Sequence, residues 1–150
     1  MAAKLGGTII RTKTSERALM DAAINEKVET CIDDRGGIIF PAFQAAFDGM
    51  IATVKLFEFI SLLKKPLSEI VNGIPDFYAR ASRIPCPWED KGKVMRYAME
   101  FAKDKETHLL DGVKIMLGND EWVLVLPDPD RPFVNIWVES TSEKKVTDLL

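Results

Sequence analysis

Residues 111–140, DGVKIMLGNDEWVLVLPDPDRPFVNIWVES, decide the fold, because they predict three consecutive strands. Apolar and β-branched residues predominate in Val113–Met116, Trp122–Leu126 and Phe133–Val138, and each run alternates between two faces. Gly118-Asn119-Asp120 is a turn-forming cluster between the first two runs. The stretch therefore predicts part of an antiparallel sheet.

The loop between the last two strands, Pro127-Asp-Pro-Asp-Arg-Pro132, carries three prolines, two acids and one arginine in six residues. Proline fixes φ and has no amide hydrogen to donate, so this loop is expected to be stiff and to hold its charges in a set shape. A rigid charged loop between two apolar strands is a candidate functional site.

The residues around this stretch complete a small domain. Asp76–Ile84 predicts a strand, Asp90–Lys103 an amphipathic helix and Ser142–Leu150 a final helix. Together they predict an α+β domain over residues 75–150, with an antiparallel four-stranded sheet and helices on one face.

The first half predicts an α/β domain over residues 1–74. Short β-rich runs at Gly7–Thr12 and Val28–Ile32 flank a helix whose N-cap is Thr14 or Ser15. Asp33–Gly37 then forms a turn before a further strand, Ile38–Pro41.

The longest helix of this half is predicted at Gly49–Lys64, with Asp48 as its N-cap. Apolar residues occupy nearly every side of it, so we expect it to be buried against more than one neighbour. A short helix from Pro66 ends at Asn72-Gly-Ile-Pro75, the candidate domain boundary.

Composition excludes several classes of protein. The 150 residues are 47% hydrophobic and 29% charged, as in a soluble globular protein, and the net charge of −3 predicts neither nucleic acid nor membrane binding. No apolar run reaches the roughly 20 residues that span a bilayer, and Met1-Ala-Ala-Lys4 does not begin a secretory signal. Cys31 and Cys86 have no metal-ligand spacing, so a reduced, cytoplasmic protein is expected.

Asp111-Gly-Val-Lys and Pro132-x-x-x-Ile-x-Val-Glu139 resemble the last domain of the α-D-phosphohexomutases, the phosphoglucomutase and phosphomannomutase family. In that resemblance, the family's R-P-S-G-T-E-P type phosphate loop falls on Leu126–Pro132. The family's Arg, Ser, Gly and Thr are replaced by Leu126, Asp128, Pro129 and Asp130. Carboxylates repel a phosphate dianion, so the resemblance implies the fold but an altered activity.

The first half resembles the family's third domain, incomplete and with a partial mixed sheet, and its sugar-binding G-E-x-S/N-G-G loop falls on Ile32–Gly37. The family's phosphoserine loop and Asp-rich magnesium loop belong to its first two domains, and nothing here resembles them. The resemblance therefore implies no catalytic residue and no metal site in this chain. Magnesium is expected only in the missing domains.

Two sets of candidate substrate residues follow from the resemblance. The sugar-loop residues are Asp33, Arg35, Gly36 and Gly37, and the phosphate-loop residues are Asp128, Asp130, Arg131 and Asn135. Asp128 and Asp130 alone provide too few oxygen ligands to bind a hard cation such as magnesium. The alternative interpretation is an ordinary Gly-Gly hairpin and a rigid surface turn.

Three functional classes stay open. The chain is the C-terminal part of a mutase-like protein that recognises a hexose phosphate or regulates a partner domain, or it is the substrate-binding half of an active mutase. The third class is a structural or homo-oligomerising module. The resemblance extends to altered mutase regions fused behind sugar-1-phosphate nucleotidyltransferases such as mannose-1-phosphate guanylyltransferase. Partners would then be missing N-terminal mutase or nucleotidyltransferase domains. The sequence leaves open whether the chain is an enzyme.

Overall fold

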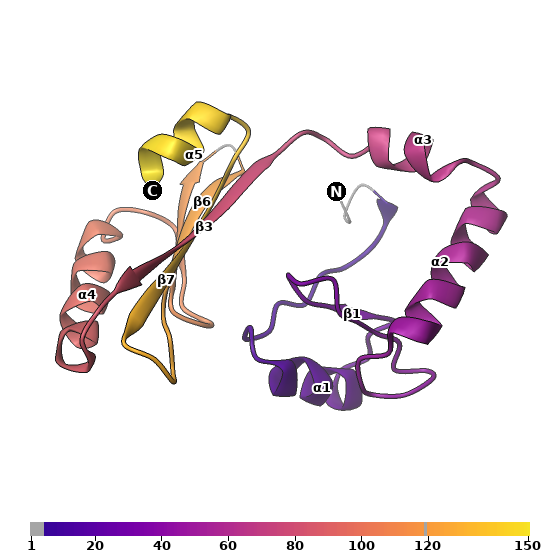
Figure 1. The fold of residues 1–150 in the computed structure, drawn as a ribbon, viewed down its shortest axis with the longest axis horizontal. Helices are drawn as coiled ribbons and strands as arrows, with labels where there is room; N and C mark the ends of the chain where they lie inside the picture. Colours follow the sequence, from indigo (N-terminus) through magenta and orange to yellow (C-terminus); the bar gives the residue numbers. More distant parts are fainter. Residues whose placement is uncertain (1–4, 119) are drawn as a thin grey trace. The chain divides into compact units, whose positions relative to one another are not determined.

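The computed structural model describes residues 5–118 and 120–150. It divides the chain into two compact units, one ending at Ile74 and the other running from Pro75 to Leu150 (Figure 1). The division falls at the Asn72–Pro75 segment. The predicted turn at Asn119 and the start at Met1–Lys4 lie outside the described residues.

The first unit pairs a small hairpin with three helices. Its elements are α1 (Glu16–Asn25), β1 (Cys31–Ile32), β2 (Ile38–Ile39), α2 (Gly49–Leu63) and α3 (Leu67–Asn72). The predicted caps are confirmed: the Ser15 hydroxyl accepts the Ala18 amide, and Asp48 accepts the amides of Met50 and Ile51. These bonds satisfy first-turn amides that have no partner within the helix.

The core of this unit lies between α1 and the hairpin. Leu19 and Ala23 from α1 are buried with Cys31 and Ile39, which stand opposite each other in the β1–β2 pair. Burial raises the pKa of the Cys31 thiol, because a desolvated thiolate is disfavoured. This thiol is therefore a core group and not an activated nucleophile.

Three expectations for this unit are wrong. Gly7–Thr12 forms no strand, and the sheet of the described residues is a two-stranded antiparallel pair and not a mixed sheet. A β-prone run needs a neighbouring strand to pair its backbone groups, and no strand of the described residues pairs with Gly7–Thr12. No residue of α2 is buried, although its composition predicts a core helix.

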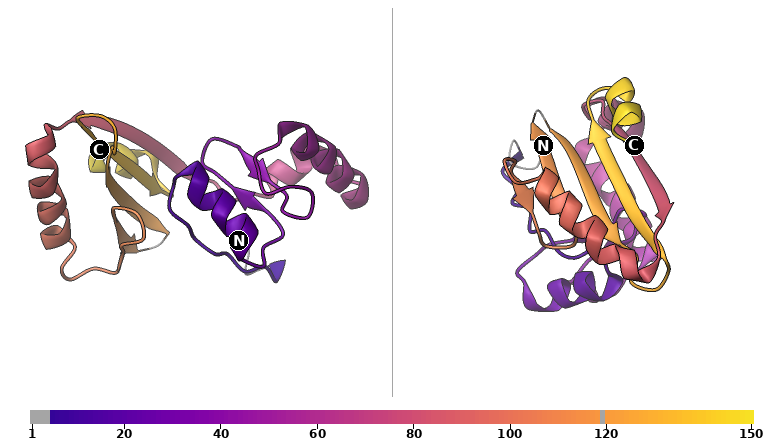
Figure 2. Two further views of the ribbon diagram at one scale, coloured as in Figure 1. Left: turned by 90° about the horizontal axis from the view of Figure 1, so that it is seen from below. Right: turned by 90° about the vertical axis from the view of Figure 1, so that its left-hand side faces the viewer.

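The second unit contains a five-stranded antiparallel sheet in the order β3-β7-β6-β5-β4 (Figures 1 and 2). The elements are β3 (Tyr78–Pro85), α4 (Trp88–Phe101), β4 (Thr107–His108), β5 (Val113–Gly118), β6 (Glu121–Pro127), β7 (Phe133–Ser140) and α5 (Glu143–Leu149). The three central strands are confirmed. The prediction of four strands is wrong, because the sheet has β4 as a fifth strand. The sequence did not indicate β4, since a strand of two residues is too short to show an alternating pattern.

Both helices of this unit cover the same face of the sheet. Figure 2 shows α4 lying across the sheet. Met95 and Ala98 of α4 pack against the core cluster that contains Val113 and Ile115 of β5. Val113 faces Val125, which faces Ile136, so these residues share that face. Ser140 lies on the same side of β7, by the alternation of the strand.

The start of α5 is fixed to this face by a buried carboxylate. Glu121 Oε1 accepts from the Ser140 hydroxyl at 3.1 Å and from Lys145 Nζ at 2.7 Å. The Lys145 bond is the main reason that the pKa of Glu121 is held below its usual value, and the Ser140 bond adds to it. Val146, the next residue of α5 after Lys145, is fully buried.

Candidate functional site

The turn between β1 and β2 is closed by the side chain of Asp33. Its Oδ1 accepts the Arg35 amide at 2.9 Å and the Gly37 amide at 2.6 Å. The Asp33 amide donates to the Gly37 carbonyl at 3.0 Å. This carboxylate thus holds the loop in shape with an oxygen that would otherwise be available to a sugar hydroxyl.

The geometry of this turn explains why glycine occupies positions 36 and 37. Gly36 has a φ of +85°, a conformation that side chains with a Cβ rarely adopt. A Cβ on Gly37 would lie 2.8 Å from the Phe47 ring and 2.9 Å from Asp33 Oδ2. Arg35 is the exposed member of the loop, and its guanidinium has no ion pair or hydrogen bond among the described residues.

The loop after β6 is closed in the same way by Asp128. Its Oδ1 accepts the amides of Asp130 and Arg131, each at 3.0 Å, and its Oδ2 accepts from Asn135 Nδ2 at 3.5 Å. The Asp130 amide is the main cause of a lowered pKa of Asp128, to which Asn135, Arg131 and the charge of Arg83 add.

Lys91 fixes this loop from the side of α4. Its ammonium donates to the carbonyls of Asp128 and Arg131, each at 2.6 Å, and lies 3.5 Å from the centre of the Trp88 ring. Its side chain is buried, which is rare for lysine and requires such partners. Sequence reasoning missed Lys91, because backbone carbonyls 37 and 40 residues away leave no sequence signal.

Arg83 on β3 is a second residue that the sequence did not indicate. It stands opposite Asn135 in the β3–β7 pair, and its Nε donates to Asn135 Oδ1 at 3.2 Å. Its guanidinium carbon lies 5.8 Å from the centre of the Phe133 ring. The structure therefore brings Asp128, Asn135 and Arg83 together, whereas the side chains of Asp130 and Arg131 point to no partner among the described residues.

The chemistry of both loops is similar. In each, backbone amides that could bind an anion already donate to an internal carboxylate, Asp33 or Asp128. In each, one exposed arginine follows: Arg35 in the first loop and Arg131 in the second. At either loop a ligand can therefore bind to an exposed guanidinium. It cannot bind to the backbone amides that already donate to Asp33 or Asp128.

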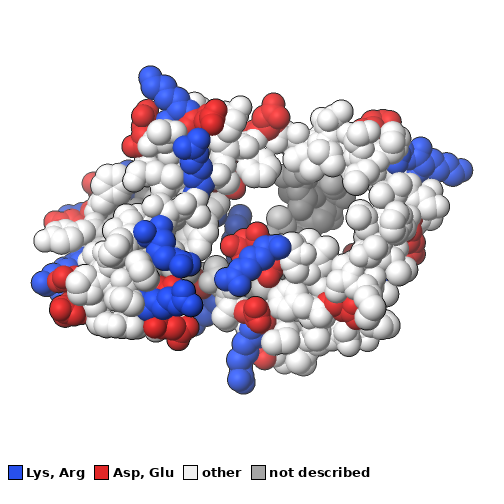
Figure 3. Space-filling model, in the orientation of Figure 1, with Lys and Arg blue, Asp and Glu red and all other residues white. Residues whose placement is uncertain are grey.

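Charge and metal-ligand patterns add no further site among the described residues. Acidic and basic side chains are interspersed on the face drawn in Figure 3. Among residues 5–118 and 120–150, no three histidine, cysteine or acidic side chains gather as metal ligands. In the same part of the chain, no helix has the length and apolarity to cross a membrane.

Comparison with known proteins points to one family. Residues 1–78 match the family described as phosphoglucomutase/phosphomannomutase, alpha/beta/alpha domain III. The chain is 29% identical to a probable phosphoglucosamine mutase of Methanothermobacter thermautotrophicus, covering 93% of this chain and 32% of the relative. It is also 29% identical to a phosphoglucomutase/phosphomannomutase of Thermococcus kodakarensis, covering 100% of this chain and 33% of that relative.

A solved structure supports the fold. The crystal structure of a phosphoglucomutase/phosphomannomutase family protein from Burkholderia thailandensis superposes with a TM-score of 0.78 at 19% identity, over 98% of this chain and 31% of that chain. The chain thus spans about a third of the length of the relatives that it matches.

Proposed function

Because the chain belongs to the phosphoglucomutase/phosphomannomutase family and corresponds to its C-terminal region, we propose that it recognises a hexose phosphate without transferring the phosphate by itself. Phosphoryl transfer needs a nucleophile or acceptor and a group that stabilises the transferring phosphate. The sequence contains no stretch that resembles the family's phosphoserine loop or magnesium loop. A module of this kind would bind substrate for domains elsewhere in the protein.

One observation carries the proposal. Arg35 and Arg131 are exposed on closed, rigid turns, and their guanidinium groups have no partner among the described residues. A guanidinium suits a phosphate because its N–H groups can bond two oxygens at once. Asp33 and Asp128 occupy the neighbouring amides, so the affinity should be weak, on the order of millimolar, which corresponds to about 4 kcal/mol of binding energy.

Calorimetric titration tests the proposal. Mannose 6-phosphate, glucose 6-phosphate and glucosamine 6-phosphate should bind, whereas mannose without phosphate should not. Arg35→Ala and Arg131→Ala should each weaken binding at its own loop severalfold, because each removes a charged hydrogen-bond donor. Arg11→Ala and Arg96→Ala, which remove exposed arginines outside the two loops, are the matched controls.

A further variant checks the role of the internal carboxylate. Asp128→Ser removes a negative charge beside the loop amides and should raise the affinity for the same phosphates, on the order of tenfold. If no sugar phosphate binds to either the natural chain or Asp128→Ser, the recognition proposal is wrong. Equal losses in the loop variants and in the control variants would also contradict it.

The named relatives favour a second candidate, the substrate-binding half of an active mutase. In that case, adding the N-terminal mutase domains of a relative should produce conversion between hexose 6-phosphate and 1-phosphate. Asp128 and Leu126, which replace the polar residues of the family's phosphate loop, make this the weaker candidate.

A further inference from the structure

The most unusual surface of the molecule is formed by α2. Between Gly49 and Leu63 the only charged residues are Lys55 and Glu58, which pair with each other at 2.8 Å. None of the fifteen residues of this helix is buried. Met50 is 81% exposed, Leu62 71% and Phe57 66%. A helix that is apolar all round normally lies inside a protein, and a patch of this kind marks an interface.

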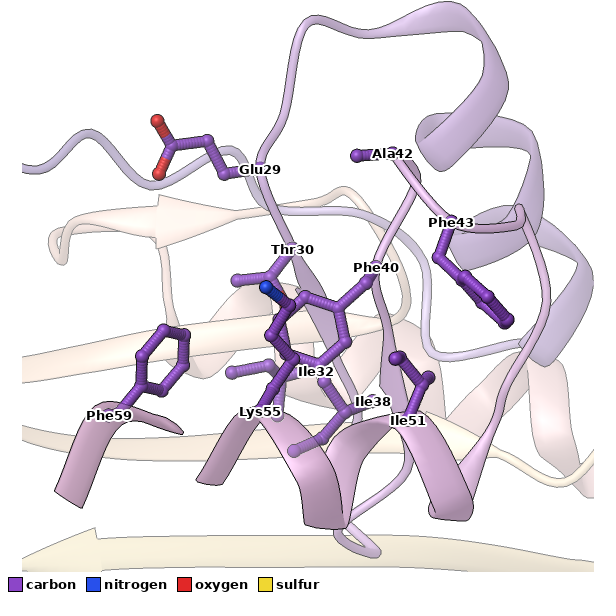
Figure 4. Close-up of a pocket in the computed structure, with 10 residues that line it drawn as sticks. All are labelled: Glu29, Thr30, Ile32, Ile38, Phe40, Ala42, Phe43, Ile51, Lys55 and Phe59. Carbon is purple, nitrogen blue, oxygen red and sulfur yellow. The ribbon is translucent and has the colours of Figure 1, made fainter. Parts of the chain in front are cut away.

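A cavity of about 630 Å³ opens between α2 and the β1–β2 hairpin. Figure 4 shows Ile51, Lys55 and Phe59, one stripe of α2, facing the hairpin residues Ile38 and Phe40. The Lys55 ammonium is already paired with Glu58, so this lysine adds no unpaired charge. The other walls are mostly apolar, with Glu29 and Thr30 as the remaining polar lining residues. The cavity has room for several apolar side chains.

The hairpin beside the cavity is an incomplete sheet. β1 and β2 have two residues each, and Ile9 and Ile10, in the β-prone run before them, are exposed and belong to no strand. An alpha/beta/alpha domain, the architecture named for the family that residues 1–78 match, needs a sheet between its helical layers. The first unit has helices and two short strands, but too little sheet to cover α2.

We propose that the α2 surface, defined as α2 together with the cavity residues Ile32, Ile38 and Phe40, binds a mutase-type polypeptide that corresponds to the N-terminal two-thirds of the relatives. The relatives are about three times as long as this chain, so they contain that additional polypeptide. Its strands would extend the hairpin, and its apolar side chains would fill the cavity.

A second copy of this chain fits the surface less well. It would bring another apolar α2 but the same short hairpin, so it could cover the helix without completing the sheet. The proposal rests on the family membership and not on sugar-phosphate binding, since neither Arg35 nor Arg131 lies on the α2 surface. The two proposals can therefore fail separately.

Co-expression tests the interface. The probe is the N-terminal two-thirds of the Methanothermobacter thermautotrophicus relative, produced together with this whole chain. We expect a one-to-one complex by size-exclusion chromatography with light scattering. Amide hydrogen exchange in α2 should slow at least tenfold in the complex, because its amides become shielded and its helix more stable.

Two variants locate the contact. Phe57→Glu and Phe59→Glu place a charge on the α2 surface and should weaken the complex at least tenfold. Tyr97→Glu, at a residue of α4 that is 69% exposed, is the matched control and should leave the complex unchanged. Because the helix residues are exposed, circular dichroism should show the natural helix content in all three variants.

Three results would overturn the proposal. The first is a dimer of this chain alone that Phe57→Glu dissociates, which would make a second copy the occupant. The second is no association with the probe while α2 still exchanges freely. The third is a complex that the two α2 variants do not weaken.

Discussion

Asp33 and Asp128 have the same structural role in two separate turns, since each carboxylate accepts hydrogen bonds from the backbone amides of residues that follow it. The sequence identified both positions as candidates for ligand contact. It could not show that the oxygens are already occupied, because an acid in a turn is equally suited to a ligand and to its own backbone.

The pH dependence of stability follows from the lowered pKa of Asp128. An unfolded Asp titrates near pH 3.9, and the folded value lies below that. The stability that the charged form contributes is therefore complete above the unfolded pKa and is lost as pH falls through the folded pKa.

We predict that Asp128→Asn is less stable than the natural chain at pH 7 and that the difference shrinks as pH falls below about 4. Asparagine keeps an acceptor oxygen but has no charge, so the comparison isolates this group from other carboxylates. Urea unfolding followed by tryptophan fluorescence measures it, since Trp88, Trp122 and Trp137 all lie in the second unit. A difference that stays constant from pH 7 to pH 2 would contradict the prediction.

At the scale of helices and strands, the sequence predicted those features that depend only on neighbouring residues. The caps Ser15 and Asp48 and the strands β5, β6 and β7 were predictable, because hydroxyl and carboxylate caps and two-residue alternation are properties of a short stretch. The position of Lys91 under the loop was not, because it depends on long-range packing of α4.

The failed expectations have a related cause. β4 is too short to show a period, and Gly7–Thr12 has the composition of a strand without a neighbour to pair with. The composition of α2 indicates burial, yet the described chain leaves none of its residues buried. In each case the sequence encodes a preference that only a partner element can satisfy.

Lys91→Met tests how α4 supports the loop. The change removes two hydrogen bonds from a charged donor, and we expect the second unit to lose about 1.5–3 kcal/mol of unfolding free energy. Methionine keeps much of the apolar contact with Trp88, so the loss reports the bonds to the carbonyls of Asp128 and Arg131.

The measurement is urea unfolding followed by tryptophan fluorescence, with Lys103→Met as the control, since Lys103 is exposed just beyond α4. The control should change the unfolding free energy by less than about 0.5 kcal/mol. Equal effects of the two variants would mean that the ammonium of Lys91 contributes nothing beyond its charge.

At the scale of the whole molecule, the two units differ in how much of a core they contain. Among residues 5–74, the core of the first unit consists of Leu19, Ala23, Cys31 and Ile39, which is a small core for a unit of this length. The second unit buries Val113, Ile115, Val134, Val138 and Val146 between its sheet and helices, together with Cys86 and Ala102. Buried apolar area is the main favourable contribution to folding, so the second unit should be the more stable.

We therefore predict that residues 75–150, produced alone, unfold in urea with the same fluorescence midpoint as in the whole chain. Residues 1–74, produced alone, should show no cooperative transition by circular dichroism, since their few buried side chains cannot offset the loss of chain entropy. Adding the N-terminal mutase probe should restore a transition if the α2 surface is where the missing apolar contacts are made. A cooperative transition of residues 1–74 without any partner would show that α2 is stable while exposed. The stability argument for a partner bound to the α2 surface would then be wrong.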